Sequence, residues 1–291
     1  MRDIFLATHN EINLVSGTKR FNPDILIRIN LFLETNKFEI PASTDIERTR
    51  HVQTHEAFFL HLVNTHNVGF MITLPDIEKL IFQAVAMVGY MNYIRCPNMT
   101  ENQSRSNSVL TMMLKQKLIK LFLDLDPKDV SIVFEIETLL FNMKHIWKRV
   151  CDHANACART IKLFSEMEEC WMFTPSLFES YMLATDIIIF SERNDPWCVQ
   201  VKQPCGTDSE FLIELIEEEP TKVESSKEQE WLRRLFCGIQ HFNNLYKEYS
   251  FTPCRVTVLP EHISDFKANI SKARDFFEHD SNKTNQHFNA A

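Results

Sequence analysis

The chain has 291 residues, a net charge of −8, and only 5 glycines against 23 phenylalanines and 11 methionines. It is long enough to bury a large core in one or two domains, and its negative charge disfavours general binding to phosphate backbones. Scarce glycine disfavours glycine-rich phosphate loops and turn-rich β architecture. The composition therefore favours a helical protein with a soft, aromatic interior.

The first hundred residues predict an N-terminal helical extension. Asn22 can cap a helix that starts at Pro23, because proline suits the first turn. Charges interrupt every apolar run, so no run is long enough to span a membrane. We expect three helices here, over residues 23–38, 44–64 and 77–93.

Histidines gather on the second of these expected helices. His51 and His55 are four residues apart, so both imidazoles could bind one metal ion. His61 lies further along the same segment, and no HExxH pattern accompanies the three. The alternative interpretation, solvated or capping histidines, stays open beside a metal-dependent enzyme.

The centre of the chain consists of two apolar helical runs that meet at a proline, within residues 118–147. Pro127 fixes its own φ and disfavours the α conformation at Asp126, so the first helix should end near Leu125. Asp126 is then placed to cap the next helix, and Asp129 complements its positive end. We predict two helices that turn sharply at Pro127.

The second half also indicates helices. We expect them over residues 151–173, 176–190, 228–249 and 263–277. Residues 197–204 could form a short strand or an extended loop, and β-branched residues alternate within 252–259. The polar segment 96–108 reads as a loop.

These elements predict an all-α fold, a layered helical sandwich of about ten helices with at most a small β element. The helical core should span residues 101–280, after the extension over 1–100 and before a disordered tail over 281–291.

The sequence carries no nucleophile elbow, Walker loop, dinucleotide fingerprint or kinase motif. Cys151, His153 and Cys157 have ligand-type side chains, but together they scatter around a helix, so buried thiols are the preferred interpretation. A Cys-His pair that assembles only in space stays open. We therefore predict a protein that is not an enzyme and that has no cofactor.

None of the eight cysteines forms a CxxC pair, which leaves a ribbon-type zinc site unsupported. The N-terminus lacks the apolar run of a signal peptide. We predict reduced thiols and an intracellular location, in the nucleus or the cytoplasm.

A family pattern covers the central helices. The matching positions are Lys117, Phe122, Leu125, Asp129, Val133 and Phe134. This spacing resembles the signature of nuclear receptor ligand-binding domains, although the family glutamine is Val130 here. Residues 176–196 resemble a later buried helix of that family, with Glu179, Leu183, Ile187 and Phe190 at its spacing.

The resemblance implies a receptor-like regulatory domain in transcription control. It would bind a lipophilic ligand and helical coregulator peptides, and form homo- or heterodimers through residues 228–249. The implied coregulator groove consists of Lys117, Phe122, Val133 and Phe134. The implied ligand pocket consists of Ser108, Met112, Phe141, Met143, His145 and Phe242. We expect no membrane contact and no direct nucleic-acid contact from this segment.

The alternative is an all-α scaffold or adaptor, for example a viral one, that works through protein–protein interaction without a small-molecule ligand.

Overall fold

A computed structural model of the chain shows two compact units. The structure describes residues 10–12, 17–36, 74–94, 101–140, 143–167, 170–176, 179–180, 183–191, 196–202, 212–217, 219, 227–245, 250–257, 271 and 273. We call residues 15–155 the helical unit, and residues 1–14 with 156–291 the α/β unit. The boundary falls inside one continuous helix, α7 (Lys144–Ser165). The segments predicted from the sequence (1–100, 101–280 and 281–291) have other bounds and stay predictions.

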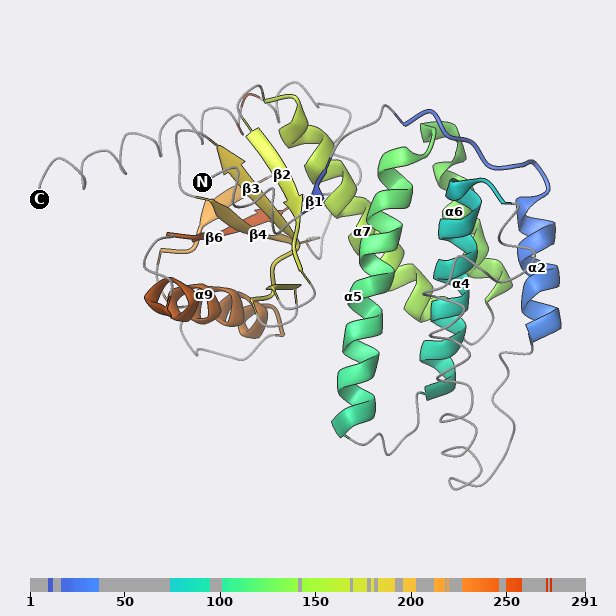
Figure 1. Cartoon of the computed structure of the whole chain (residues 1–291), viewed down its shortest axis with the longest axis horizontal. Coiled ribbons are helices and arrows are strands. Elements are labelled where there is room, and N and C mark those ends of the chain that lie inside the picture. The colour runs from blue at the N-terminus through green and yellow to red at the C-terminus, as the bar shows by residue number, and fades with distance from the viewer. Residues whose placement is uncertain are drawn as a thin grey trace, which may run out of the picture. The chain divides into compact units, whose positions relative to one another are not determined.

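The helical unit is built around two long helices, α4 and α5, which pack along each other (Figure 1). Residues 81–91 of α4 are all buried, so this helix is surrounded on every side. The described elements of the unit are α2 (Ile25–Asn36), α4 (Asp76–Ile94), α5 (Glu101–Asp124), η2 (Pro127–Asp129), α6 (Val130–Glu135), η3 (Ile136–Leu139) and the first half of α7.

The predicted break at Pro127 is confirmed. Helix α5 ends at Asp124, and Asp126 caps the next turn by accepting a hydrogen bond from the Lys128 N–H at 2.9 Å. That turn is the 3-10 helix η2. The single helix expected to follow it as far as residue 147 is wrong, because α6 ends at Glu135, η3 ends at Leu139 and α7 begins only at Lys144. The proline therefore separates α5 from the turn that follows, as its fixed φ predicts.

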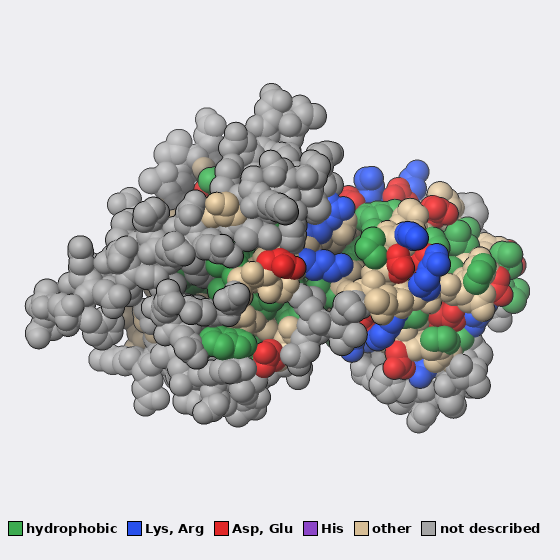
Figure 2. All heavy atoms as spheres, turned by 90° about the horizontal axis from the view of Figure 1, so that it is seen from above, with side chains coloured by type: hydrophobic (Ala, Val, Ile, Leu, Met, Phe, Trp, Pro, Cys, Tyr) green, Lys and Arg blue, Asp and Glu red, His purple; other side chains and the backbone are tan. Residues whose placement is uncertain are grey.

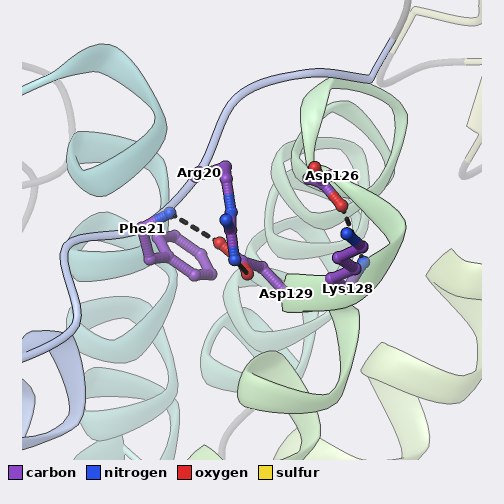
Figure 3. A network of polar contacts seen from close by, with 5 residues as sticks. All are labelled: Arg20, Phe21, Asp126, Lys128 and Asp129. Atoms are coloured by element: carbon purple, nitrogen blue, oxygen red, sulfur yellow. Dashed lines mark hydrogen bonds and ion pairs between the residues drawn. The ribbon is translucent and has the colours of Figure 1, made fainter.

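An extended segment, residues 17–22, crosses the end of α5, and we call it the N-terminal strap (Figure 3). The Lys19 N–H donates to the Asp124 carbonyl at 3.1 Å, and the Asp126 N–H donates to the Lys19 carbonyl at 2.8 Å. Asp129 is 4% exposed; its carboxylate accepts from Arg20 at 3.0 Å and from the Phe21 N–H at 2.9 Å. The strap thus bonds to backbone groups at the end of α5 that the helix itself leaves unpaired.

The α/β unit holds a six-stranded sheet in the order β1-β2-β3-β4-β6-β5 (Figure 1). Strands β4 and β6 are parallel, and the other neighbours are antiparallel. The strands are β1 (Asn10–Glu11), β2 (Cys170–Thr174), β3 (Ile187–Ser191), β4 (Trp197–Lys202), β5 (Leu212–Leu215) and β6 (Thr252–Thr257).

Helix α9 (Lys227–Leu245) follows β5 and precedes β6, so β5 and α9 together form the connection between the parallel strands β4 and β6, and α9 contacts both of them. Its apolar face packs on the sheet through Leu232, Leu235, Phe236 and Ile239. Phe242 meets the ring of Phe251 edge-on at 5.3 Å. The long amphipathic helix predicted over residues 228–249 is confirmed as far as Leu245.

The predicted all-α fold is wrong, because the second half of the chain forms a mixed sheet. Residues 187–191, expected within a helix, form the central strand β3, and residues 170–174 form β2 rather than the end of a helix. A strand that is buried on both faces is continuously apolar, so its period cannot be distinguished from that of a buried helix.

Other predictions concern segments that do not belong to the sheet. The expected loop 96–108 is wrong from Glu101, where α5 begins. The expected helix 44–64, with His51, His55 and His61, lies outside the described residues, as does most of the helix expected over 263–277. Within the described chain no helix has the length and apolar character needed to cross a membrane.

Candidate functional site

Asp186 immediately precedes β3, at the end of the sheet where the parallel strands β4 and β6 finish. Its N–H donates to the Val199 carbonyl at 2.8 Å, and its carboxylate accepts from the Val201 N–H at 2.9 Å. The residue is 8% exposed. In open α/β sheets, ligands bind outside the carboxyl ends of the strands, so Asp186 is held at a suitable edge.

Gln200 lies on β4 between Val199 and Val201, the two residues that bond Asp186. It is 3% exposed, and its amide N–H donates to the Ala184 carbonyl at 3.2 Å. Its oxygen Oε1 is buried without a hydrogen-bond partner in the described part of the chain. A buried unpaired oxygen costs about 1–3 kcal/mol, so this position calls for a ligand or water.

Strain accompanies this arrangement. Ala184, which accepts the Gln200 bond, has a φ of 51°, a value that non-glycine residues seldom adopt. Such strain is found at functional sites because the surrounding structure must hold it. Ala184 immediately precedes Thr185 and Asp186, so the strained backbone sets the entry to β3.

Lys202 brings a positive charge to the same end of the sheet. It follows Gln200 by two residues on β4, so both side chains point to the same face. Its Nζ lies 6.0 Å from the ring centroid of Trp231 on α9, and the Arg234 guanidinium lies 4.5 Å from that ring. The Trp231 ring thus has two cations beside it at this end of α9.

A thiol of α7 lies close to Asp186 within the α/β unit. The Cys157 Sγ and a carboxylate oxygen of Asp186 lie within 4.8 Å of each other. Both residues are buried.

The sequence did not predict that Cys157 and Asp186 lie close together. Cys151, His153 and Cys157 were expected to scatter around one helix, and all three lie on α7. Asp186 falls inside a segment expected to be helical, so its approach to Cys157 could be seen only once β3 was known.

Buried polar residues are concentrated around this site. Half of those that the structure describes lie within residues 179–200, namely Glu179, Ser180, Thr185, Asp186 and Gln200. Burial, and after it the charge of Glu179, raise the pKa of the Cys198 thiol. Cys198 therefore stays a neutral thiol and does not supply a reactive thiolate.

The predicted coregulator groove lies in the helical unit. Lys117 is half-buried and donates to Gln83 at 2.9 Å; burial, and after it the charge of Lys120, lower its pKa. Phe122 and Val133 are buried, while Phe134 is half-buried and stacks on Phe122 at 5.8 Å. The structure brings the two rings together, and peptide binding there stays a prediction.

The residues of the predicted ligand pocket are spread over both units. Met112 and Met143 are buried in the helical unit, where Ser108 is half-buried and His145 is exposed. Phe242 belongs to the α/β unit and packs on its core. Phe141 lies outside the described residues, as do the predicted metal ligands His51 and His55, so both sites stay predictions.

The charges of the described helices are mixed. In the view of Figure 2, basic, acidic and apolar side chains are interspersed on the helices of residues 15–155. That face therefore offers no field of a single sign that would attract an oppositely charged partner.

Comparisons with protein-family models, with curated proteins and with solved structures found no match for the chain. The chemistry of the site therefore has to be inferred from its own residues. These are a buried carboxylate, an unpaired amide oxygen and an ammonium group at one end of a sheet.

Proposed function

We propose that the α/β unit is a metal-dependent hydrolase of phosphate esters. Asp186 and Gln200 supply oxygen ligands to the metal ion, and Lys202 contacts the phosphate. The observation that supports this most is the Oε1 of Gln200, which is buried without a partner among the described residues, on a residue that lies between the two that bond Asp186.

Carboxylate and amide oxygens are the ligands that hard divalent cations prefer. A metal ion at Asp186 and Gln200 would satisfy the amide oxygen and offset the cost of its burial. A bound ion of this kind polarises a phosphoryl oxygen and lowers the pKa of a coordinated water, which then attacks phosphorus.

Lys202 supports phosphate as the substrate group. Its flexible ammonium is suited to a phosphate oxygen, whose negative charge grows as the bond to the leaving group breaks. A net charge of −8 disfavours phosphate binding over the surface in general, but it does not oppose one lysine beside a bound cation.

The test is hydrolysis of bis(4-nitrophenyl) phosphate and of 4-nitrophenyl phosphate by the full chain, with Mg²⁺, Mn²⁺ or Zn²⁺ added. Asp186→Asn keeps an oxygen acceptor for the Val201 N–H but removes the charge, and we expect a loss of at least about 100-fold. Lys202→Gln should lower kcat by roughly 100-fold because it acts on the transition state.

Matched controls come from the same unit. Glu214→Gln removes a carboxylate of β5 that pairs with Arg255 at 2.7 Å, and Lys162→Gln removes a half-buried lysine of α7. Both should leave the rate within a factor of two or so of the parent. Hydrolysis that is equal in Asp186→Asn and Glu214→Gln, or no metal-dependent hydrolysis at all, would refute the proposal.

The receptor-like regulatory function and the adaptor alternative remain predictions. The break at Pro127 that the receptor resemblance requires is present, but the all-α fold that both implied is not. The intracellular, reducing location belongs to the present proposal too, because the Cys157 thiol, which is in no disulfide, lies beside Asp186.

A further inference from the structure

We infer that the substrate of the α/β unit is a nucleotide, whose aromatic base stacks on Trp231 of α9 while its phosphate contacts Lys202 of β4. The inference rests on the proposed function only in assigning the phosphate to Lys202. It narrows the substrate from phosphate esters in general to esters that carry a base. The side chains that support it all belong to the α/β unit.

Trp231 leaves part of a large aromatic ring open to solvent. It is 36% exposed, and the other large apolar side chains of the described residues that are as exposed are all aliphatic. Helix α9 packs on the sheet through Leu232, Leu235 and Phe236, and Trp231 lies outside that core. An exposed aromatic ring beside cationic groups is the kind of surface on which bases stack.

Arg234 adds a second stacking group. It lies three residues after Trp231 on α9, and its guanidinium is 4.5 Å from the centroid of the indole ring, within the range of a cation–π contact. A guanidinium plane stacks on bases as an aromatic ring does. Trp231 and Arg234 thus place two stacking groups next to each other, and we call this pair the base platform.

The base platform lies at a suitable distance from the group that would contact phosphate. The Lys202 Nζ is 6.0 Å from the centroid of the Trp231 ring, at the limit of a cation–π contact, so little attraction opposes its rotation towards a phosphate. One sugar separates the base of a nucleotide from its phosphate. The groups that bind the two parts must therefore lie near each other without touching, as Trp231 and Lys202 do.

The charge of the chain favours a single nucleotide over a nucleic-acid strand. The net charge is −8, and an acidic side chain, Glu219, pairs with Arg233 of α9 at 3.8 Å. A long polyanion would be repelled by such a surface. One phosphate needs only the local charge of Lys202 and of a bound cation. The prediction that this segment does not contact nucleic acid directly is therefore kept.

The experiment compares the binding of AMP and of ribose 5-phosphate to the full chain by calorimetry, with EDTA present so that no metal-dependent hydrolysis consumes the ligand. Both ligands carry the phosphate, and only AMP carries a base. We expect AMP to bind roughly 5- to 150-fold more tightly, the range that base–aromatic stacking supplies. Trp231→Leu should reduce the affinity for AMP to that for ribose 5-phosphate and leave the latter unchanged.

Tryptophan fluorescence gives a second readout. Trp231 is the most exposed of the four tryptophans, since Trp147 and Trp197 are buried and Trp171 is half-buried. A base stacked on Trp231 should quench part of the emission, and Trp231→Leu should abolish that quenching. Ribose 5-phosphate, which has no base, should leave the emission of the parent unchanged.

Neighbouring arginines provide a matched pair of variants. Arg234→Gln should weaken AMP binding about 2- to 5-fold, because it removes the guanidinium from the base platform. Arg233→Gln removes an exposed guanidinium of the same helix that pairs with Glu219, and it should leave AMP binding unchanged. Trp231→Phe keeps an aromatic ring and should retain most of the preference for AMP. Circular dichroism checks that each variant folds.

Three results would overturn the inference. These are equal affinities of the parent for AMP and ribose 5-phosphate, a preference for AMP that survives in Trp231→Leu, and an equal loss of both ligands in that variant. The last result would mean that Trp231 does not act on the base.

The outcomes separate the two proposals. Binding of AMP that depends on Trp231, without metal-dependent hydrolysis of any phosphate ester, would refute the proposed function and support the base platform. Metal-dependent hydrolysis of bis(4-nitrophenyl) phosphate that is lost in Asp186→Asn, without a preference for AMP, would support the function and refute the base platform.

Discussion

The two units treat buried polar groups differently. In the helical unit, Asp129 accepts two hydrogen bonds from the N-terminal strap, and Glu78 pairs with Arg28 at 2.7 Å. In the α/β unit, Ser180 and Gln200 each bury an oxygen atom that has no partner among the described residues. In the helical unit, buried polar groups thus pair with other protein groups and stabilise the fold. In the α/β unit, two buried oxygen atoms can accept hydrogen bonds or coordinate a ligand.

Among the substitutions that test this difference between the units, we expect the largest effect at Gln200. Gln200→Leu removes the unpaired oxygen and should lower phosphate-ester hydrolysis by roughly 100-fold. Its free energy of unfolding should stay within about 1 kcal/mol of the parent, because the lost Ala184 bond is offset by removal of a buried unpaired atom. Urea unfolding and a rate assay on one preparation measure both; a large loss of stability with normal activity would reverse the assignment.

The second-largest effect is expected in the helical unit, where a substitution should lower stability. Asp129→Ala leaves the Phe21 N–H without its acceptor and should destabilise by about 1–3 kcal/mol. Arg20→Gln keeps the bond from the Phe21 N–H and changes only the largely exposed ion-pair partner of Asp129. It should therefore lower the free energy of unfolding clearly less. Urea midpoints compare the two variants. Equal losses would mean that the ion pair, rather than the buried backbone bond, holds the strap.

A smaller loss is expected at Gly17. A Cβ atom there would meet the Leu125 carbonyl oxygen at 2.7 Å and that of Leu123 at 3.0 Å. Both contacts are with backbone, which cannot rotate away, so Gly17→Ala should destabilise the helical unit by about 1–2 kcal/mol. Thermal unfolding is the measurement. A stability equal to the parent's would show that the strap does not sit closely on the end of α5.

The smallest effect is a pH dependence of the helical unit. Burial raises the pKa of Asp129, but the bonds from Arg20 and Phe21 outweigh it and hold the pKa below its ordinary value of 3.8. A lowered folded-state pKa contributes stability above the ordinary value, and this contribution is lost as the pH falls below it. Urea midpoints between pH 5 and about 2.5 should therefore decline less steeply in Asp129→Asn. Parallel curves would contradict this assignment.

The helical unit was largely readable from sequence because its signals are local. Asn22, Pro23, Asp126 and Pro127 mark helix ends within a few residues, and the structure keeps those ends. The strap could not be predicted, because Arg20 and Phe21 meet Asp129 across more than a hundred residues. Pairings of that kind leave no periodic trace in the chain.

The α/β unit was misread because its central strands are buried on both faces. Ile187–Ser191 has no alternation of apolar and polar residues, and its length does not exclude the end of a helix. Once that segment was assigned to a helix, Asp186 could not be brought beside Gln200 or Cys157. The site depends on strand register, which only the paired sheet defines.

The most direct test of the account is the stabilisation of the α/β unit by a metal ion. A ligand bound only to the folded state at 100 times its Kd adds about 2.7 kcal/mol. We predict that Zn²⁺ or Mn²⁺ raises the urea midpoint of the parent chain and of Glu214→Gln, and leaves that of Asp186→Asn unchanged. A midpoint that no divalent ion shifts, or one that shifts equally in Asp186→Asn, would contradict the claim that this end of the sheet is built for a ligand.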